Sequence, residues 1–166
     1  MLLNVNRKRT RTAETGLDRA VLDCLGSFGG CLVDLAGTGA GGEPIDQQEL
    51  RHSVVVTALD AVEERIRPGI YTEDIRRLTR ETMAGFGHRP ELVSVTTYGI
   101  FGEVFELPAE DSLETGHYLE QGMVLNTEVF HRDPGRGSFH LEDSVRIEVS
   151  GLCLLHPVTR QLVAIA

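Results

Sequence analysis

Apolar residues recur at helical spacing in the middle of the chain, and this pattern predicts two helices. The first covers about residues 46–67, with Leu50 and Ile66 near the two ends of its apolar face and a Pro-Gly pair just after it. The second covers about residues 72–84, where Thr72 is a suitable N-cap and the glycines beyond residue 84 stop the helix.

Period-two patterns predict strands on both sides of the helices. Residues 19–35 form an expected hairpin, with apolar runs around a Gly-Ser-Phe-Gly-Gly turn, and the glycine-rich residues 37–42 are expected to be a connection. Residues 93–98 are rich in β-branched side chains, and residues 122–130 and 139–149 alternate around a Pro-Gly turn. Two helices between two strand-rich portions indicate an α+β domain.

We expect one domain over residues 19–166, preceded by a short basic arm over residues 1–18. The chain has 166 residues, which is in the usual size range of a single domain. The first 12 residues hold no acid and four basic side chains: Arg7, Lys8, Arg9 and Arg11. Such a terminus favours a solvated and partly disordered arm.

Composition narrows the classes of function. The formal net charge of −9 argues against nucleic acid as a main partner, because binding phosphates needs a positive surface. Apolar runs are too short to span a bilayer and the start of the chain does not resemble a secretory signal, so a cytoplasmic protein without membrane contact is expected. The 3 cysteines form no C-x-x-C pair, which favours buried thiols over a zinc site or a disulfide.

Carboxylates stand in the middle of several predicted strands. Glu128 lies within an apolar run, Asp23 and Asp34 lie in the two arms of the first hairpin, and Glu142 shares a strand face with His140. One acid of this kind is usually a salt-bridged or rim residue, because a buried carboxylate is costly unless it is paired or binds a cation. Four of them on hairpin strands indicate an oxygen-rich site for one hard divalent ion.

Five segments, in this order, resemble motifs of the pita-bread family, which includes methionine aminopeptidase, aminopeptidase P, prolidase and creatinase. They are Asp23–Thr38, Gly42–Pro44 with Arg67–Gly69, Tyr98–Pro108, Leu119–Glu128 and His140–Val145. The resemblance covers about residues 20–160. It implies a curved antiparallel sheet covered by helices, and a shortened form of it, because segments matching the family's usual first half are missing.

The resemblance also implies a ligand set. It places metal ligands at Asp23, Asp34, Glu128 and Glu142, which could hold one divalent ion (Mn, Mg, Co or Zn) or none.

The departures from the family pattern fall on its active-site positions. Tyr98 stands where the family has a metal-ligating histidine, and Phe105 where it has a catalytic histidine. Gly37 and His140 replace arginines of the motifs, and Val129 replaces a proline. Phenylalanine neither ligates metal nor transfers protons, and tyrosine, with a pKa of roughly 10, is a poor general base near neutral pH.

The candidate catalytic residues that follow are Tyr98, His140, Glu128 and Glu142. His140 lies on the strand face of Glu142 and could compensate for the lost histidines; the alternative is a partly buried His–Glu pair. His131 stands next to the predicted turn and is expected at the surface.

Three hypotheses for function follow. The first is a repurposed enzyme that acts on a small, amino-acid-derived molecule in an acid-lined pocket. The second is a metal-dependent aminopeptidase-like or prolidase-like hydrolase of peptide-like substrates. The third is a non-catalytic binding subunit, paired with a second copy of the chain or with another protein.

Overall fold

In the part of the chain that the computed structural model describes, strands form two four-stranded sheets, ordered β1-β2-β3-β8 and β4-β5-β6-β7. The described residues are 4–10, 19–28, 31–89, 93–99, 117–133, 137–156 and 159–165. The elements are β1 (Asn4–Thr10), β2 (Arg19–Phe28), β3 (Cys31–Gly41), α1 (Asp46–Glu63), α2 (Thr72–Gly85), β4 (Val93–Gly99), β5 (Val124–Asp133), β6 (Gly137–Glu148), β7 (Gly151–Leu154) and β8 (Val163–Ile165).

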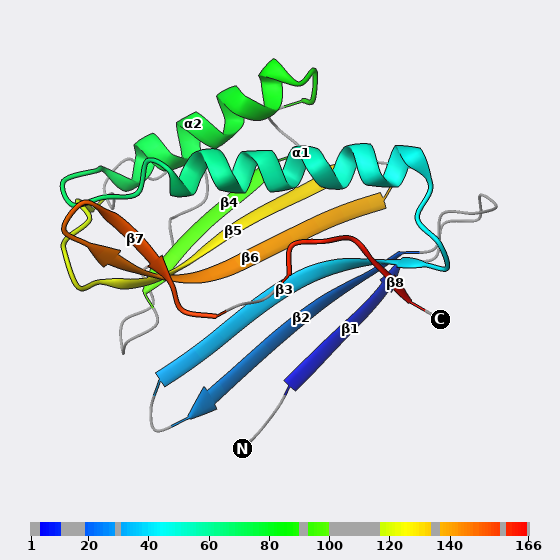
Figure 1. Cartoon of the computed structure of the whole chain (residues 1–166), viewed down its shortest axis with the longest axis horizontal. Helices are drawn as coiled ribbons and strands as arrows, with labels where there is room; N and C mark the ends of the chain where they lie inside the picture. Colours follow the sequence, from blue (N-terminus) through cyan, green and yellow to red (C-terminus); the bar gives the residue numbers. More distant parts are fainter. Residues whose placement is uncertain are drawn as a thin grey trace.

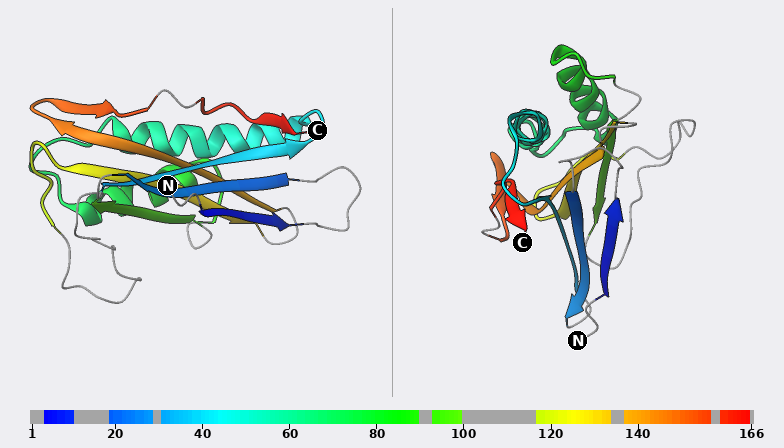
Figure 2. Two further views of the ribbon diagram at one scale, coloured as in Figure 1. Left: turned by 90° about the horizontal axis from the view of Figure 1, so that it is seen from below. Right: turned by 90° about the vertical axis from the view of Figure 1, so that its right-hand side faces the viewer.

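Both helices lie against the sheet of β4–β7, and β1 and β2 extend away from them (Figure 1, Figure 2). The hydrophobic core forms between α1 and the odd-numbered positions of β5 and β6, because side chains alternate between the two faces of a strand. Its fully buried members include Val55, Leu59, Val129, Val145 and Ile147. Burying each such side chain contributes roughly 1.5–3 kcal/mol. The even-numbered positions of both strands therefore face away from α1.

Helix α1 begins at Asp46 as predicted but ends at Glu63, a few residues early. The Ile45 N–H donates to the Gln48 side chain at 3.0 Å, which satisfies one of the free donors at the start of the helix. Leu50, at the N-terminal end of the apolar face, is 67% exposed, so the buried part of that face begins further along the helix.

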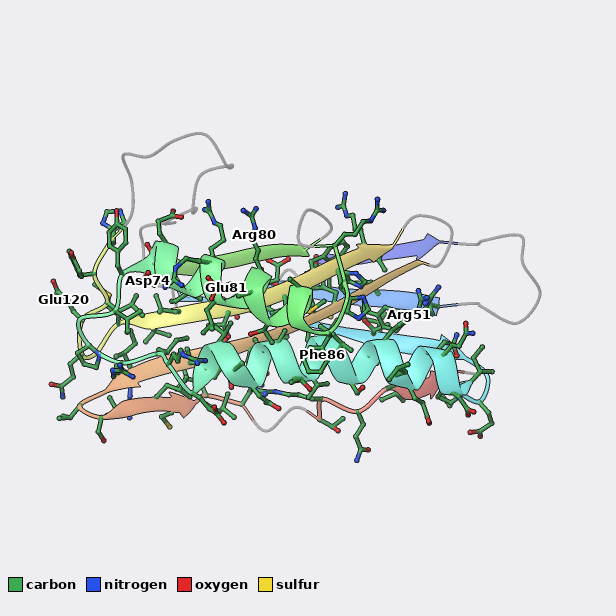
Figure 3. All side chains as sticks on the ribbon, turned by 90° about the horizontal axis from the view of Figure 1, so that it is seen from above. Arg51, Asp74, Arg80, Glu81, Phe86 and Glu120 are labelled. Atoms are coloured by element: carbon green, nitrogen blue, oxygen red, sulfur yellow. The ribbon has the colours of Figure 1, made fainter. Side chains whose placement is uncertain are left out.

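Helix α2 carries a strongly one-sided pattern, with Ile75, Thr79 and Met83 buried and charged residues outside. Asp74 and Glu81, both labelled in Figure 3, are exposed. Thr72, expected as the N-cap, is instead the first helical residue. Its backbone N–H donates to the His117 carbonyl, and its hydroxyl accepts from the His117 N–H at 3.0 Å.

The glycine-rich residues 37–42 were expected to be a connection, but β3 continues through them to Gly41. Close packing at Gly39 explains this use of glycine. A Cβ at that position would lie 2.2 Å from Cδ1 of Ile165, whose strand β8 pairs with β3 in parallel. At the other edge of the sheet, the expected basic arm contains β1, which pairs antiparallel with β2.

The described cysteine side chains differ in exposure. Cys24 is half-buried and Cys153 is exposed, so the prediction of buried thiols is wrong for Cys153.

Among the described residues, no helix is both long and apolar enough to cross a membrane.

The two sheets meet along β3 and β6, which lie side by side in Figure 1. Across this junction, the Thr38 side chain forms hydrogen bonds with both backbone groups of His140. The Thr38 hydroxyl donates to the His140 carbonyl at 3.0 Å and accepts from the His140 N–H at 2.8 Å. Both residues are buried, so these groups have lost access to bulk water. The hydroxyl is therefore required to satisfy the backbone of β6 at the junction.

Replacing Thr38 with valine tests this role. Thr38→Val keeps the shape but leaves two buried backbone groups unsatisfied, and we expect a loss of about 2 kcal/mol in the free energy of unfolding. Thr38→Ser, which keeps the hydroxyl, is the matched control and should lose clearly less. Urea unfolding followed by circular dichroism measures both, and equal losses in the two variants would contradict the role.

Candidate metal centre

Three carboxylates from three strands meet where β3 lies against β6. Asp23 of β2, Asp34 of β3 and Glu142 of β6 each offer an oxygen, and these oxygens all lie within 4.8 Å of one another. Asp23 pairs with Ala36 and Asp34 pairs with Leu25, so the two aspartates are two register steps apart and share one face of the hairpin. The other sheet supplies the third acid.

A polar network fixes Glu142. The Asn126 amide nitrogen donates to the Glu142 carboxylate. The Ser144 hydroxyl, which has one proton to donate, lies 3.3 Å from both the Asn126 side-chain oxygen and the Asp34 carbonyl oxygen. Asn126, Glu142 and Ser144 are all buried. Such supporting contacts hold a ligand's orientation.

Asn126 and Ser144 were not predicted as site residues. Each is two positions from a predicted acid, on the same strand face, and they pair with each other across β5 and β6. The period-two pattern therefore contains the signal that could have identified them.

Glu128 lies outside the group of three. It pairs directly with Glu142 in the β5–β6 ladder, yet its Oε1 lies 3.0 Å from His140 Nε2. The distance is that of an ion pair, although the alignment is not that of a hydrogen bond. Among the described residues, the metal-ligand geometry thus unites three of the four predicted acids, and the fourth contacts the histidine.

His140 is held in a tight environment. Its side chain is 7% exposed, and the Phe130 ring packs edge-on against it with 4.9 Å between ring centroids. Its backbone bonds to Thr38, as described above. His140 thus forms a partly buried His–Glu pair, but with Glu128 across the ladder and not with Glu142 of its own strand face.

Two other predicted positions are covered less fully. Tyr98 lies in β4 opposite Asn126, in the row next to that of Glu128, but its side chain lies outside the described residues. Phe105 lies outside them altogether. The roles suggested for both residues stay predictions.

The opposite face of β6 carries a second charged cluster. Arg160 forms ion pairs with Asp60 and Glu63 of α1 and with Asp143 of β6. Burial raises the pKa of Glu63 to about 7, and this effect outweighs the lowering by Arg160. Thr127 lies 3.4 Å from the Glu63 carboxylate, within the same cluster. This cluster ties the C-terminal segment to α1.

Two further histidines contact residues inside the protein. His131, expected at the surface, is only 1% exposed, and its ring packs 4.9 Å from that of His88; that prediction is wrong because β5 turns this side chain inward. His156 accepts a hydrogen bond from the Ser144 N–H at 2.8 Å, and burial lowers its pKa.

The group of three has the dimensions of a cation site. Metal–oxygen bonds for calcium are about 2.3–2.6 Å and for magnesium about 2.0–2.1 Å, so two oxygens on opposite sides of one ion are about 4–5 Å apart. The oxygens of Asp23, Asp34 and Glu142 lie within this span. Three carboxylates this close also repel one another unless a cation or protons intervene. The residues present therefore fit a hard divalent ion.

A family model and a known protein sequence both match most of the chain. Residues 9–148 match the model of metallopeptidase family M24. A relative from Bacillus subtilis (strain 168), described as the uncharacterized peptidase YqhT, is 31% identical over 134 residues, which are 81% of this chain and 38% of that protein.

Solved structures confirm the pita-bread fold and the α+β class. The Xaa-Pro dipeptidase from Bacillus anthracis matches with a TM-score of 0.79 and 27% identity, over 92% of this chain and 42% of that one. The X-Pro aminopeptidase from Thermotoga maritima MSB8 matches with a TM-score of 0.79 and 23% identity, over 90% of this chain and 42% of that one. The chain spans about two fifths of the length of these proteins.

The buried Glu63 should make the fold less stable as the pH rises. Its folded-state pKa of about 7 exceeds the ordinary 4.5, so its stabilising contribution is complete below about pH 4.5 and is lost by about pH 7. The full change is roughly 3 kcal/mol. Glu63→Gln removes this titration. Between pH 5 and pH 8, the free energy of unfolding should therefore fall less in Glu63→Gln than in the wild type, by an amount on the order of 3 kcal/mol.

Glu64→Gln is the matched control, because Glu64 is the next residue and is exposed. Urea unfolding at both pH values measures the three proteins. Identical pH dependence in the wild type and Glu63→Gln would show that the raised pKa is absent.

Proposed function

The chain belongs to metallopeptidase family M24, and from this premise we propose that its acidic site holds one hard divalent cation and acts on a small, amino-acid-derived substrate. The observation that carries the proposal is the meeting of Asp23, Asp34 and Glu142 within 4.8 Å. An isolated acid on a strand has a simple structural explanation, whereas three acids drawn together from two sheets do not.

The ligand set favours particular ions. All three ligand atoms are carboxylate oxygens, which suit manganese and magnesium better than zinc or cobalt, for which imidazole or thiolate ligands are common. When bound, such an ion supplies a Lewis acid that polarises a carbonyl group and lowers the pKa of a coordinated water.

The groups around the ion argue for a changed chemistry. Glu128 and His140 lie beside the group of three and could bind the amino or amide group of a substrate. Tyr98 replaces the histidine of the family motif, and a phenol is a poor base at neutral pH. Phe105 cannot transfer a proton at all. We therefore propose Tyr98, Glu128, Glu142 and His140 as substrate-binding or acid–base groups in a reaction other than ordinary peptide hydrolysis.

A second candidate is hydrolysis of Xaa-Pro dipeptides. The observation in its favour is the likeness to the Bacillus anthracis protein, which is named an Xaa-Pro dipeptidase. A third outcome is binding without turnover, by a subunit that associates with a second copy or with another protein.

Cation binding is tested by thermal unfolding with manganese and with magnesium. A cation at about 100 times its Kd stabilises the fold by about 2.7 kcal/mol, which should raise Tm by about 5–10 °C. Asp34→Asn and Glu142→Gln should abolish this rise, because each removes one of three charged ligands. Glu120→Gln is the control, since Glu120 is exposed and lies at one end of the molecule (Figure 3).

Asp34→Asn without added metal should be at least as stable as the wild type, because one of the repelling charges is gone. A wild-type Tm that neither ion moves would refute the cation site.

Turnover separates the candidate reactions. The manganese-loaded wild type is incubated with Xaa-Pro dipeptides and with a panel of small N-acyl and amidino amino acids, and products are followed by mass spectrometry. We expect products from the second set and none from the first. Release of proline from the dipeptides, lost in Asp34→Asn, would favour the prolidase-like reaction; binding without any product would favour the non-catalytic role.

A further inference from the structure

Glu128 is positioned to join the cation site but contacts another residue instead. It is the direct cross-strand partner of Glu142, and directly paired side chains point to the same face of the sheet with Cβ atoms about 4.5–5.5 Å apart. A glutamate there could reach an ion held by Glu142. Its carboxylate lies 3.0 Å from His140 Nε2 and is not part of the group formed with Asp23 and Asp34.

His140 is the fixed member of this pair. Its backbone N–H and carbonyl both bond to Thr38, and its ring packs against Phe130, the residue directly opposite in the ladder. The His140 side chain is 7% exposed and that of Glu128 is 19% exposed. Glu128 is therefore the side chain with more room to move, because the His140 ring is nearly buried and packs against Phe130.

Charge also favours this division of the acids. Asp23, Asp34 and Glu142 carry three negative charges against the two positive charges of a divalent ion. While the site is empty, a fourth carboxylate would add to the repulsion among these three, and the contact with His140 avoids that cost. Once released, the same negative charge would strengthen the attraction for an ion. The imidazole of His140 offers Glu128 a polar partner that does not compete for space at the ion.

We propose that His140 holds Glu128 out of the cation site, so that the chain binds a single divalent ion on three carboxylates and keeps Glu128 on the substrate side. This proposal rests on the cation binding proposed above. It makes His140 the residue that sets the ligand number, although it is not itself a ligand. Its removal should free Glu128 to become a fourth ligand.

Manganese titrations by isothermal calorimetry test the proposal on the wild type, Glu128→Gln, His140→Asn and the double variant. The wild type should bind one ion per chain, and Glu128→Gln should bind it with a Kd within about twofold, because Glu128 is not a ligand. His140→Asn keeps a polar side chain too short to reach Glu128, and its Kd should fall by about tenfold as a fourth carboxylate joins. The double variant should lose that gain.

A Kd for Glu128→Gln that rises by about tenfold, as expected of a lost ligand, overturns the proposal even if His140→Asn does not fold. Two ions per wild-type chain also overturn it, as does an unchanged Kd in a folded His140→Asn. Asp34→Asn separates failure of this proposal from failure of the proposed cation site. If the wild type binds no manganese, both proposals fail. If Asp34→Asn abolishes manganese binding while His140→Asn leaves the Kd unchanged, the cation site is upheld and only the role of His140 fails.

Discussion

The acidic site depends on one constraint, which is that β3 lies alongside β6. Two of the three grouped carboxylates belong to one sheet and the third to the other, so they meet only where the sheets meet. Two side-chain hydroxyls bridge this junction: Thr38 bonds to the backbone of His140, and Ser144 lies 3.3 Å from the Asp34 carbonyl oxygen. The site and the join between the sheets are thus built from the same few residues.

Strand β6 carries unusual electrostatic demands, because acids on both of its faces are buried. Glu142 faces the acidic site and Asp143, the next residue, faces α1. On the helix side, Arg160 supplies the compensating positive charge. On the other side, the proposed cation would do so. One strand would then be balanced on one face by a side chain of the same protein and on the other by an ion from solution.

Much of this arrangement could be predicted from the sequence. A β-branched run indicated β4, and alternation indicated β5 and β6. The eleven-residue spacing of Asp23 and Asp34 across a turn indicated that a hairpin could bring the two acids together, and the register shows them on one face. The contact between β3 and β6 could not be predicted in the same way, because period-two patterns describe a strand's faces and not its neighbours. The contact between Glu128 and His140 could not be predicted either. The ladder places Glu142 directly opposite Glu128, and only the side-chain conformations show that the Glu128 carboxylate contacts His140.

Local exceptions have local causes. The glycine-rich run to Gly41 looked like a connection because glycine weakens strands, but at Gly39 the missing Cβ gives Ile165 room to pack. Helical spacing put Leu50 on the apolar face, yet it is exposed because it lies near the start of α1, where the core does not extend. Burial of His131 depends on the packing of β5, which the turn beside it does not indicate.

The Thr38–His140 contact has a mechanical consequence. The ring of His140 contacts Glu128, and the backbone of the same residue bonds to Thr38 across the junction of the two sheets. Any widening of the gap between β3 and β6 would pull Asp34 away from Glu142 and at the same time shift the ring that restrains Glu128. Ion affinity and the spacing of the sheets would be linked quantities, and linkage works in both directions. An ion bound by carboxylates of both sheets would hold the sheets together, so that the metal-loaded protein resists separation of β3 from β6.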